Sequence, residues 1–166
     1  MRLFVTGGAG FIGSNYVHHV LGTTDDEVTV FDALTYAGNL ANLADLEGDP
    51  RYRFVHGDIC DREAVAAALP GHDAVVHFAA DSHVDRSLLD PDVFVRTNCS
   101  GTNVLCDVAV EVGVERFLHI STDEVYGSIE EGSFRESDRL DPRSPYSASK
   151  AGSDLIALSY HSTHGL

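Results

Sequence analysis

A tyrosine and a lysine stand four residues apart, as Tyr146 and Lys150. On a helix this spacing places both side chains on one face. A free tyrosine has a pKa of about 10, too high for a base at neutral pH, and a neighbouring ammonium favours the phenolate. The pair is therefore suited to taking a proton from a hydroxyl group while hydride leaves the same carbon. The pattern also occurs often by chance, and the alternative is an amphipathic helix with a surface lysine.

Three glycines at a spacing of three, Gly7, Gly10 and Gly13, follow the first expected strand. This variant of the dinucleotide fingerprint supplies a tight turn, close approach of backbone to a pyrophosphate, and a helix whose N–H groups point at the phosphates. Asp32 follows Gly13 by 19 residues. A carboxylate there accepts from adenosine ribose hydroxyls and repels a 2′-phosphate. The sequence therefore predicts NAD rather than NADP, against the alternative of ordinary turn glycines and a surface aspartate.

Two further strand ends complete the expected cofactor site. Asp58 and Ile59 end the third expected strand, where a carboxylate and an aliphatic side chain suit the edge and face of an adenine. Taken alone, a solvated aspartate is equally consistent with this position. Phe78, Ala79 and Ala80 end the fourth expected strand, and small residues there let a cofactor lie against the backbone.

Short apolar runs alternate with helical patterns along the chain. The expected strands are Leu3–Thr6, Val28–Asp32, Tyr52–His56, Ala74–Ala79 and Phe117–Ser121. Several of these are continuously apolar, which indicates strands covered on both faces. The expected helices are residues 11–21, with Ile12, Tyr16, Val17, Val20 and Leu21 on one side, and residues 61–69, 91–112 and 145–160. The alternation predicts a doubly wound parallel α/β sheet in one domain, residues 1–166. Residues 127–144 are expected to be a loop that covers a site.

Composition restricts the classes of partner. Lys and Arg number 11 against 26 Asp and Glu, and the net charge of −15 disfavours nucleic-acid binding. No apolar run approaches the roughly 20 residues that span a bilayer. The first strand begins too early for a signal peptide, so we expect a cytoplasmic protein that does not bind membranes. Cys60, Cys99 and Cys106 are expected to be reduced apolar fillers. Neither they nor the nine histidines show metal-ligand spacing, so no metal is expected.

Together these motifs resemble the extended short-chain dehydrogenase/reductase family that acts on nucleotide sugars. Residues 32–40, 79–87 and 121–127 are similar to the corresponding segments of the dTDP-glucose 4,6-dehydratases. Asp81 stands where that family often has Glu. The resemblance implies a Rossmann-type fold, NAD as cofactor, a dTDP-glucose substrate and a homodimer. It also implies that a smaller substrate-binding part follows the Tyr–Lys helix and is missing from this sequence.

The resemblance assigns roles to individual residues. Thr122 holds the substrate hydroxyl, Tyr146 and Lys150 act in oxidation and contact the cofactor, Asp123 is the acid at O6, and Glu124 is the base at C5. Asp123 must be protonated when water leaves, so we expect it to be buried or beside another carboxylate. Without the Tyr–Lys pair, two solvated turn carboxylates would be the better interpretation. Further cofactor contacts carry over to Phe11, Ile12, Ala33, Leu34, Thr35, Ser82 and Thr97, and further substrate contacts to Ser82 and Ser87. Arg86 is expected to be solvated and Asn98 to be a structural polar residue.

The implied reaction is oxidation of the sugar at C4, elimination of water across C5 and C6, and return of hydride to C6, which gives dTDP-4-keto-6-deoxyglucose. The choice of dTDP rests on the resemblance alone, and another nucleotide-sugar dehydratase remains an alternative. A nucleotide-sugar 4-epimerase would share the fold and the Tyr–Lys pair but would not use Asp123 and Glu124 as an acid–base pair. A non-enzymatic NAD-binding module is a third possibility, and it would not need Tyr146.

Overall fold

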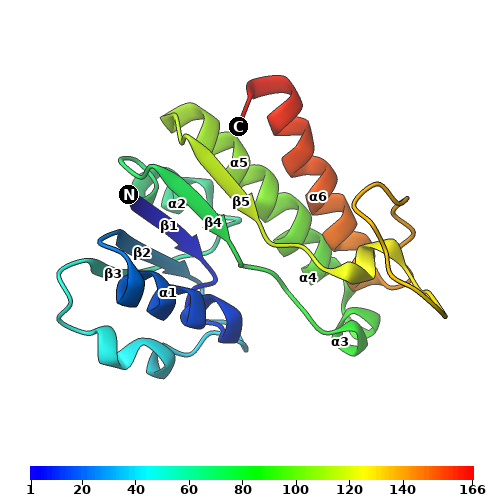
Figure 1. Cartoon of the computed structure of the whole chain (residues 1–166), viewed down its shortest axis with the longest axis horizontal. Helices are drawn as coiled ribbons and strands as arrows, with labels where there is room; N and C mark the ends of the chain where they lie inside the picture. Colours follow the sequence, from blue (N-terminus) through cyan, green and yellow to red (C-terminus); the bar gives the residue numbers. More distant parts are fainter.

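A computed structural model describes residues 1–166 and contains one five-stranded, fully parallel sheet (Figure 1). The strands are β1 (Arg2–Thr6), β2 (Glu27–Asp32), β3 (Tyr52–His56), β4 (Ala74–His77) and β5 (Arg116–His119). Their order across the sheet is β3-β2-β1-β4-β5, so the chain changes direction across the sheet between β1 and β4. This order confirms the doubly wound α/β fold that the alternation of elements predicts.

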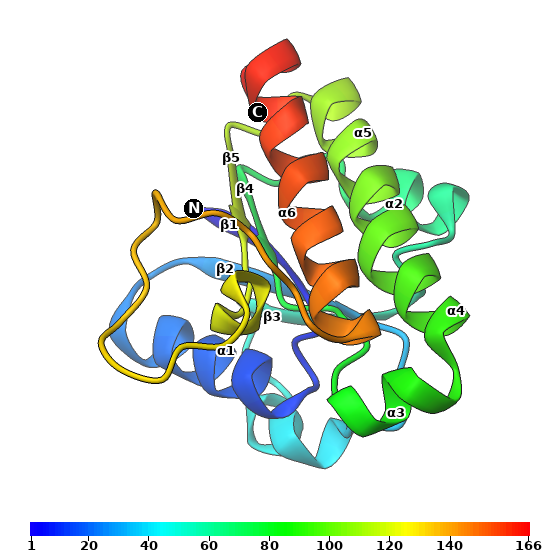
Figure 2. The same ribbon diagram turned by 90° about the vertical axis from the view of Figure 1, so that its right-hand side faces the viewer.

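Helices cover both faces of the sheet, as the edge-on view in Figure 2 shows. Helix α1 (Phe11–Thr23) lies on one face, and α2 (Arg62–Ala68), α5 (Thr102–Val112) and α6 (Pro145–His164) lie on the other. Short helical segments connect these elements: η1 (Leu40–Leu46), α3 (Val84–Leu89), α4 (Pro91–Phe94), η2 (Val95–Gly101) and η3 (Asp123–Tyr126). No helix carries an apolar stretch of the length needed to cross a membrane.

Alternate residues of the central strands enter two different cores. Val5 and Val30 pack towards α1, whereas Phe4, Phe31 and Val75 pack towards α2 and α5. The continuous apolar runs of β1, β2 and β4 are thus explained by burial on both faces, as predicted. The edge strand β5 differs from these, because Leu118 is 52% exposed.

The helix expected over residues 91–112 is interrupted. Residues Pro91–Phe94 are α-helical, Val95–Gly101 form a π-helix, and α-helix resumes at Thr102. A π-helical stretch shifts side chains relative to a regular helix and is often found at functional sites. Here it contains Thr97 and Asn98, both of which lie near the proposed site.

The predicted boundaries of the remaining elements differ by a few residues. Strands β4 and β5 end at His77 and His119, two residues earlier than expected, so the residues that follow them form loops at the edge of the sheet. Helix α6 begins as predicted, with Pro145 in its first turn and a capping box between Ser144 and Ser147. It extends four residues beyond the expected end. Residues 127–144 contain no helix or strand, and Ile129, Phe134 and Arg135 from this loop line a cavity beside η3.

The glycines of the first turn are required by close packing. A Cβ atom on Gly13 would lie 2.3 Å from the carbonyl oxygen of Gly7, and a Cβ on Gly7 would lie 2.6 Å from the amide nitrogen of Ala79. Gly7 also has a φ of +69°. The turn therefore sits against both α1 and the segment that follows β4, with no room for a side chain.

We predict that Gly13→Ala lowers the free energy of unfolding by about 1–3 kcal/mol, the usual cost of adding a methyl group to a packed site. Gly22→Ala is the matched control because Gly22 lies in the same helix and a Cβ there meets nothing within 4 Å. That change should be neutral or stabilising by up to about 1 kcal/mol. Urea denaturation measures both effects, and equal changes in the two variants would contradict this account of the turn.

Candidate active site

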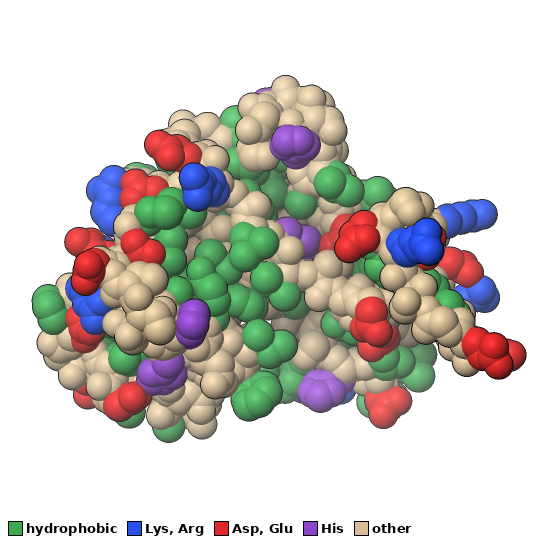
Figure 3. Space-filling view, in the orientation of Figure 1, with side chains coloured by type: hydrophobic (Ala, Val, Ile, Leu, Met, Phe, Trp, Pro, Cys, Tyr) green, Lys and Arg blue, Asp and Glu red, His purple; other side chains and the backbone are tan.

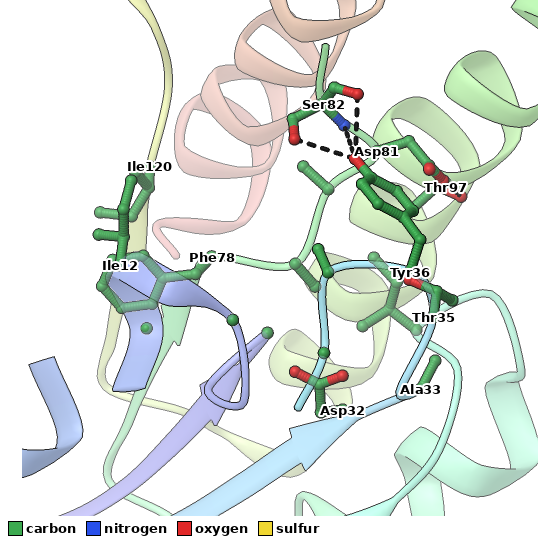
Figure 4. Close-up of a pocket in the computed structure, with 18 of the residues that line it drawn as sticks. Ile12, Asp32, Ala33, Thr35, Tyr36, Phe78, Asp81, Ser82, Thr97 and Ile120 are labelled. Atoms are coloured by element: carbon green, nitrogen blue, oxygen red, sulfur yellow. Dashed lines mark hydrogen bonds between the residues drawn. The ribbon is translucent and has the colours of Figure 1, made fainter. Parts of the chain in front are cut away.

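A cavity of about 640 Å³ opens at the carboxyl ends of the strands, where the order of the sheet reverses. Its wall is formed by the glycine turn after β1, the segments after β2, β3 and β4, and the start of α6 (Figure 4). These segments meet because parallel strands end at one edge of a sheet.

Most of the predicted cofactor residues line this cavity. They are Gly7, Gly10, Phe11, Ile12, Gly13, Asp32, Ala33, Thr35, Asp58, Ile59, Phe78, Ala79, Ala80, Ser82, Thr97, Tyr146 and Lys150. Leu34 does not line it, and its positive φ of 51° marks the tight turn after β2. Ile12 was also expected on the packed side of α1, but it is 63% exposed at the cavity.

Asp32 connects the glycine turn with the segment after β2. Its Oδ2 accepts from the amide of Ala9 at 2.9 Å, and its Oδ1 accepts from the amide of Leu34 at 2.8 Å. The side chain is 8% exposed, and each carboxylate oxygen keeps a lone pair for a further donor. The carboxylate thus fits a neutral ribose better than a phosphate group, whose negative charge it would repel.

The cavity fits a dinucleotide in two further respects. Gly10 precedes α1, which has no side-chain cap, so the amides of its first turn remain available to a phosphate. The close contact between Gly7 and Ala79 leaves a smooth backbone wall that a side chain would fill. Lys and Arg lie towards the margins of the face drawn in Figure 3, and its centre is largely apolar. Backbone donors are therefore suited to supply much of the local positive potential.

Lys150 and Tyr146 lie in the wall of the same cavity. Lys150 is 5% exposed, and its Nζ donates to the carbonyl oxygen of Ile120 at 2.6 Å. Burial lowers the pKa of Lys150, and the Asp154 carboxylate opposes this shift. Burial raises the pKa of Tyr146, and a hydrogen bond with Thr122 opposes that shift. Among this chain's own residues, the expected lowering of the Tyr146 pKa by the Lys150 ammonium is therefore not found.

The predicted acid and base lie close to Tyr146. Thr122 caps η3, and its Oγ1 accepts from the amide of Glu124 at 3.3 Å. The carboxylates of Glu124 and Asp123 both raise the pKa of Tyr146, as charges near the phenol would. Thr122 and Asp123 line the second cavity, of about 670 Å³, beside η3. Asp123 was expected to be buried or beside another carboxylate. It is exposed rather than buried, and the neighbouring carboxylate is Glu124, which is also exposed.

The two serines predicted to contact substrate occupy different environments. Ser82 lines the main cavity, where its amide donates to the hydroxyl of Tyr36 at 3.1 Å. Ser87 is fully buried in α3, and its Oγ donates to the carbonyl oxygen of Val84 at 2.6 Å. It lines neither of the two cavities. The structure therefore places Ser82 at the site and gives Ser87 a local structural contact.

Tyr36 is a cavity residue that the sequence analysis did not single out. Its hydroxyl bridges the segment after β2 to Ser82 after β4 (Figure 4). The centre of its ring lies 3.5 Å from the guanidinium carbon of Arg86. Arg86 is exposed, as expected, but it stacks on this ring. The sequence does show an aromatic residue in a polar loop. Its partner, Ser82, lies 46 residues away, so no local pattern reveals the contact.

Asn98 holds three parts of the site together. Its Oδ1 accepts from the amide of Asp81 at 2.8 Å, and its Nδ2 donates to the Asp81 carbonyl at 3.0 Å and to Ser149 Oγ at 2.8 Å. Ser149 in turn donates to the carbonyl oxygen of Tyr146. Asn98 is thus structural, as expected, but the structure that it fixes is the junction between the cavity wall and the start of α6. No three His, Cys, Asp or Glu side chains are grouped closely enough to hold a metal ion.

His77 links the glycine turn to the start of α5. Thr102 donates to the carbonyl oxygen of Asn98, so its Oγ1 accepts from His77 Nε2 at 3.0 Å. Because Nε2 carries the proton of the neutral ring, Nδ1 is an acceptor, and Thr6 Oγ1 donates to it at 2.6 Å while accepting from the amide of Ala79. Burial holds the pKa of His77 well below its ordinary value, which fits this neutral tautomer.

The order of the sheet, the glycine turn and the Tyr–Lys helix define a Rossmann-type site for a dinucleotide cofactor. The model of the GDP-mannose 4,6 dehydratase family matches residues 4–166. The chain belongs to this family.

Individual relatives share more than half of their aligned residues with this chain. The dTDP-glucose 4,6-dehydratase of Streptomyces griseus is 59% identical over 168 residues, which cover 99% of this chain and 51% of that protein. The crystal structure of DesIV, the dTDP-glucose 4,6-dehydratase of Streptomyces venezuelae, contains NAD and the ligand designated TYD. It matches with a TM-score of 0.97 at 60% identity and covers 100% of this chain and 53% of that chain. The predicted resemblance to the dTDP-glucose 4,6-dehydratases is confirmed.

A 4-epimerase is also similar in fold. The UDP-Glc/GlcNAc 4-epimerase of Campylobacter jejuni matches with a TM-score of 0.92 at 30% identity, over 99% of this chain and 50% of that chain. This chain spans about half the length of the curated relatives it matches.

We predict that replacing Asp32 with Ala weakens NAD binding by tenfold or more and weakens NADP binding less, because the carboxylate that favours the free ribose is lost. The loss of its contacts with Ala9 and Leu34 should affect both cofactors, so the ratio of the two affinities is the informative quantity. Asp25→Ala is the control, since Asp25 is exposed in the turn before β2. Isothermal titration measures each affinity. Equal affinity of the unmodified protein for the two cofactors would refute the role of Asp32.

Proposed function

We propose that residues 1–166 form the NAD-binding and catalytic domain of a dTDP-glucose 4,6-dehydratase. One observation carries the proposal. Tyr146 and Lys150 line the dinucleotide cavity, and Thr122, Asp123 and Glu124 lie near Tyr146. Ser121 lines both this cavity and the one beside η3 that Thr122 and Asp123 line. Groups suited to oxidation and groups suited to elimination thus stand together. The similarity to the dehydratases of Streptomyces supports the same function.

NAD is the proposed cofactor. Asp32 would hold the adenosine ribose, the glycine turn and the first amides of α1 would hold the pyrophosphate, and Tyr146 and Lys150 would lie at the nicotinamide end. DesIV, which is 60% identical, contains NAD in its crystal structure. When bound, NAD supplies an acceptor for the hydride of C4 and a donor of hydride to C6.

The residues of the chain would carry the proton transfers. Thr122 orients the 4-hydroxyl, and Tyr146 takes its proton as the C4 carbonyl forms. That carbonyl acidifies the hydrogen at C5, so a carboxylate such as Glu124 is a strong enough base to remove it. Asp123 protonates the hydroxyl that leaves C6. Both carboxylates are exposed in this chain, and an Asp123 that is protonated at neutral pH requires that substrate or further protein cover it.

A 4-epimerase is the second candidate, since the Campylobacter jejuni enzyme shares the fold. The dehydratase is favoured because identity to DesIV is 60% against 30% to that epimerase. The adjacent carboxylates of Asp123 and Glu124 also favour the dehydratase. An epimerase only removes and returns hydride at C4, so it has no elimination step for Asp123 and Glu124 to serve.

A homodimer and a cytoplasmic location are also part of the proposal. Leu155 and Leu158 are each 58% exposed on α6, and an apolar surface of this kind supports association of two copies. The three cysteines are free, which supports a reducing compartment. The substrate is the sugar nucleotide, and neither nucleic acid nor a membrane is a proposed partner.

The full gene product, incubated with dTDP-glucose and NAD, should give a 4-keto-6-deoxy sugar nucleotide. Tyr146→Phe should lower the rate at least a hundredfold, because it removes the proton acceptor and keeps the ring. It should leave NAD affinity within about threefold. Tyr160→Phe is the matched control and should be fully active, because Tyr160 lies farther along the same helix, lines neither cavity and donates to Asn103 on α5. Product analysis by mass spectrometry and NMR measures the outcome, with UDP-glucose and GDP-mannose tested as competitors. A 4-epimer in place of a 6-deoxy product would overturn the dehydratase assignment.

A further inference from the structure

One face of α6 lies against three consecutive residues of the segment that follows β5, Ile120–Thr122. Tyr146, Lys150 and Asp154 are spaced by four and therefore lie one above another on the helix. Tyr146 lies near Thr122, Lys150 Nζ donates to the carbonyl oxygen of Ile120 at 2.6 Å, and Asp154 Oδ2 accepts from Ser121 Oγ at 2.6 Å. The first two contacts belong to the site already described. The third has no assigned role.

Asp154 is an unusual residue to find in this position. Its side chain is only 16% exposed, and its Oδ1 lies 3.1 Å from His119 Nε2. That approach is not a hydrogen bond, because Asp154 Oδ1 has no hydrogen-bond partner and His119 Nε2 is paired with Ser153 Oγ at 3.1 Å. Ser121 is therefore the one good donor to this carboxylate. A largely buried carboxylate with few donors is costly, unless a neighbouring positive charge compensates it.

Two groups can supply that charge: Lys150, and His119 when its ring is protonated. Lys150 is the only lysine of the chain and lies one helical turn before Asp154. The titratable groups that face it are Asp154 and Tyr146 on α6, Cys99 on η2, His77 on β4 and His119 on β5.

Two of these groups are held neutral. Burial raises the pKa of the Cys99 thiol, and burial holds the pKa of His77 well below its ordinary value. Asp154 is therefore the carboxylate that offsets the positive charge of Lys150.

We infer that Asp154 is a positioning residue for the oxidation step. Its negative charge keeps the buried Lys150 protonated, and its hydrogen bond to Ser121 fixes Thr122 and the η3 carboxylates against Tyr146. The inference rests on the proposed function, because it assigns Asp154 to the same reaction. Asp154 does not line the cavity proposed for the dinucleotide, and it acts through Lys150 and Ser121.

The sign of the expected pH effect follows from this arrangement. Burial already lowers the pKa of Lys150, and the Asp154 carboxylate acts in the opposite direction. Removing that carboxylate lowers the Lys150 pKa further, so the ammonium is lost at a lower pH. The activity that depends on the ammonium should then decline at a lower pH, by about one unit for the loss of one nearby opposite charge.

The test uses the full gene product and three variants. Asp154→Asn keeps the shape and an acceptor for Ser121 but removes the charge. Ser121→Ala keeps the charge but removes the hydrogen bond. Glu115→Gln is the control, because it removes one exposed carboxylate that makes no side-chain hydrogen bond or ion pair.

Two readouts are needed. The first is the titration of Lys150 by NMR of the labelled lysine side chain, with the signal assigned by its loss in Lys150→Met. This readout does not depend on turnover. The second is the pH dependence of kcat and KM for conversion of dTDP-glucose. Thermal unfolding reports whether each variant is folded.

For Asp154→Asn we expect the Lys150 midpoint to move about one unit lower, kcat to fall about tenfold and KM to stay within twofold. The decline of kcat on the basic side should move with the Lys150 midpoint. Ser121→Ala should lower kcat without moving the midpoint, and Glu115→Gln should change neither. Asp154→Glu keeps the charge, so the Lys150 midpoint in this variant should lie close to that of the unmodified protein. This comparison stands even if Asp154→Asn is poorly folded.

An unchanged midpoint and pH profile in Asp154→Asn, with only a loss of thermal stability, would show that Asp154 is merely structural. A midpoint in Asp154→Glu that is as low as in Asp154→Asn would also overturn the inference. Failure of the proposed function looks different. In that case the unmodified protein forms no 6-deoxy product, while the NMR titration still decides the coupling between Asp154 and Lys150.

Discussion

The site depends on the pairing of β1 with β2 on one side and with β4 on the other. Phe4 and Val5 on β1 are fully buried, one against each helical layer, so the strand is held from both faces. Because all strands are parallel, the turn after β1, Asp32 after β2 and the segment after β4 emerge at one edge. The dense contact of Gly7 with Ala79 exists only in this register. A shift of either pairing would separate the groups suited to bind the cofactor.

The reactive groups depend on a second contact, the attachment of α6 to the end of β5. Lys150 is buried there and donates to the Ile120 carbonyl, and Asn98 joins the start of α6 to the segment after β4. One helix thus brings the Tyr–Lys pair to the cavity and holds the segment that leads to Asp123 and Glu124. In the proposed function, one helix would thus serve both the oxidation at C4 and the elimination at C5 and C6, through two neighbouring cavities that share Ser121.

The parts of this site that the sequence predicted are those defined by local spacing. Gly7, Gly10 and Gly13 form a turn within seven residues, and Tyr146 and Lys150 share a helix face whatever surrounds them. Asn98, Tyr36 and Asp154 act on residues far away in the chain, and no local pattern marks such contacts. The π-helical stretch at Thr97 was missed for the same reason, since it follows from packing. Leu34 and Ser87 were carried over from the family, and in this fold one forms a strained turn and the other packs inside α3.

The most direct test of the account is a single turnover of dTDP-glucose by a Glu124→Gln variant of the full gene product. The change keeps the shape of the side chain and removes the base, while Tyr146 and Lys150 are untouched. The account predicts that the sugar is oxidised at C4, that deuterium placed at C5 is retained, and that little 6-deoxy product forms. Formation of 4-keto-6-deoxy sugar at the unmodified rate, with loss of the C5 label, would contradict the central claim that oxidation and elimination are carried by separate residues of one site.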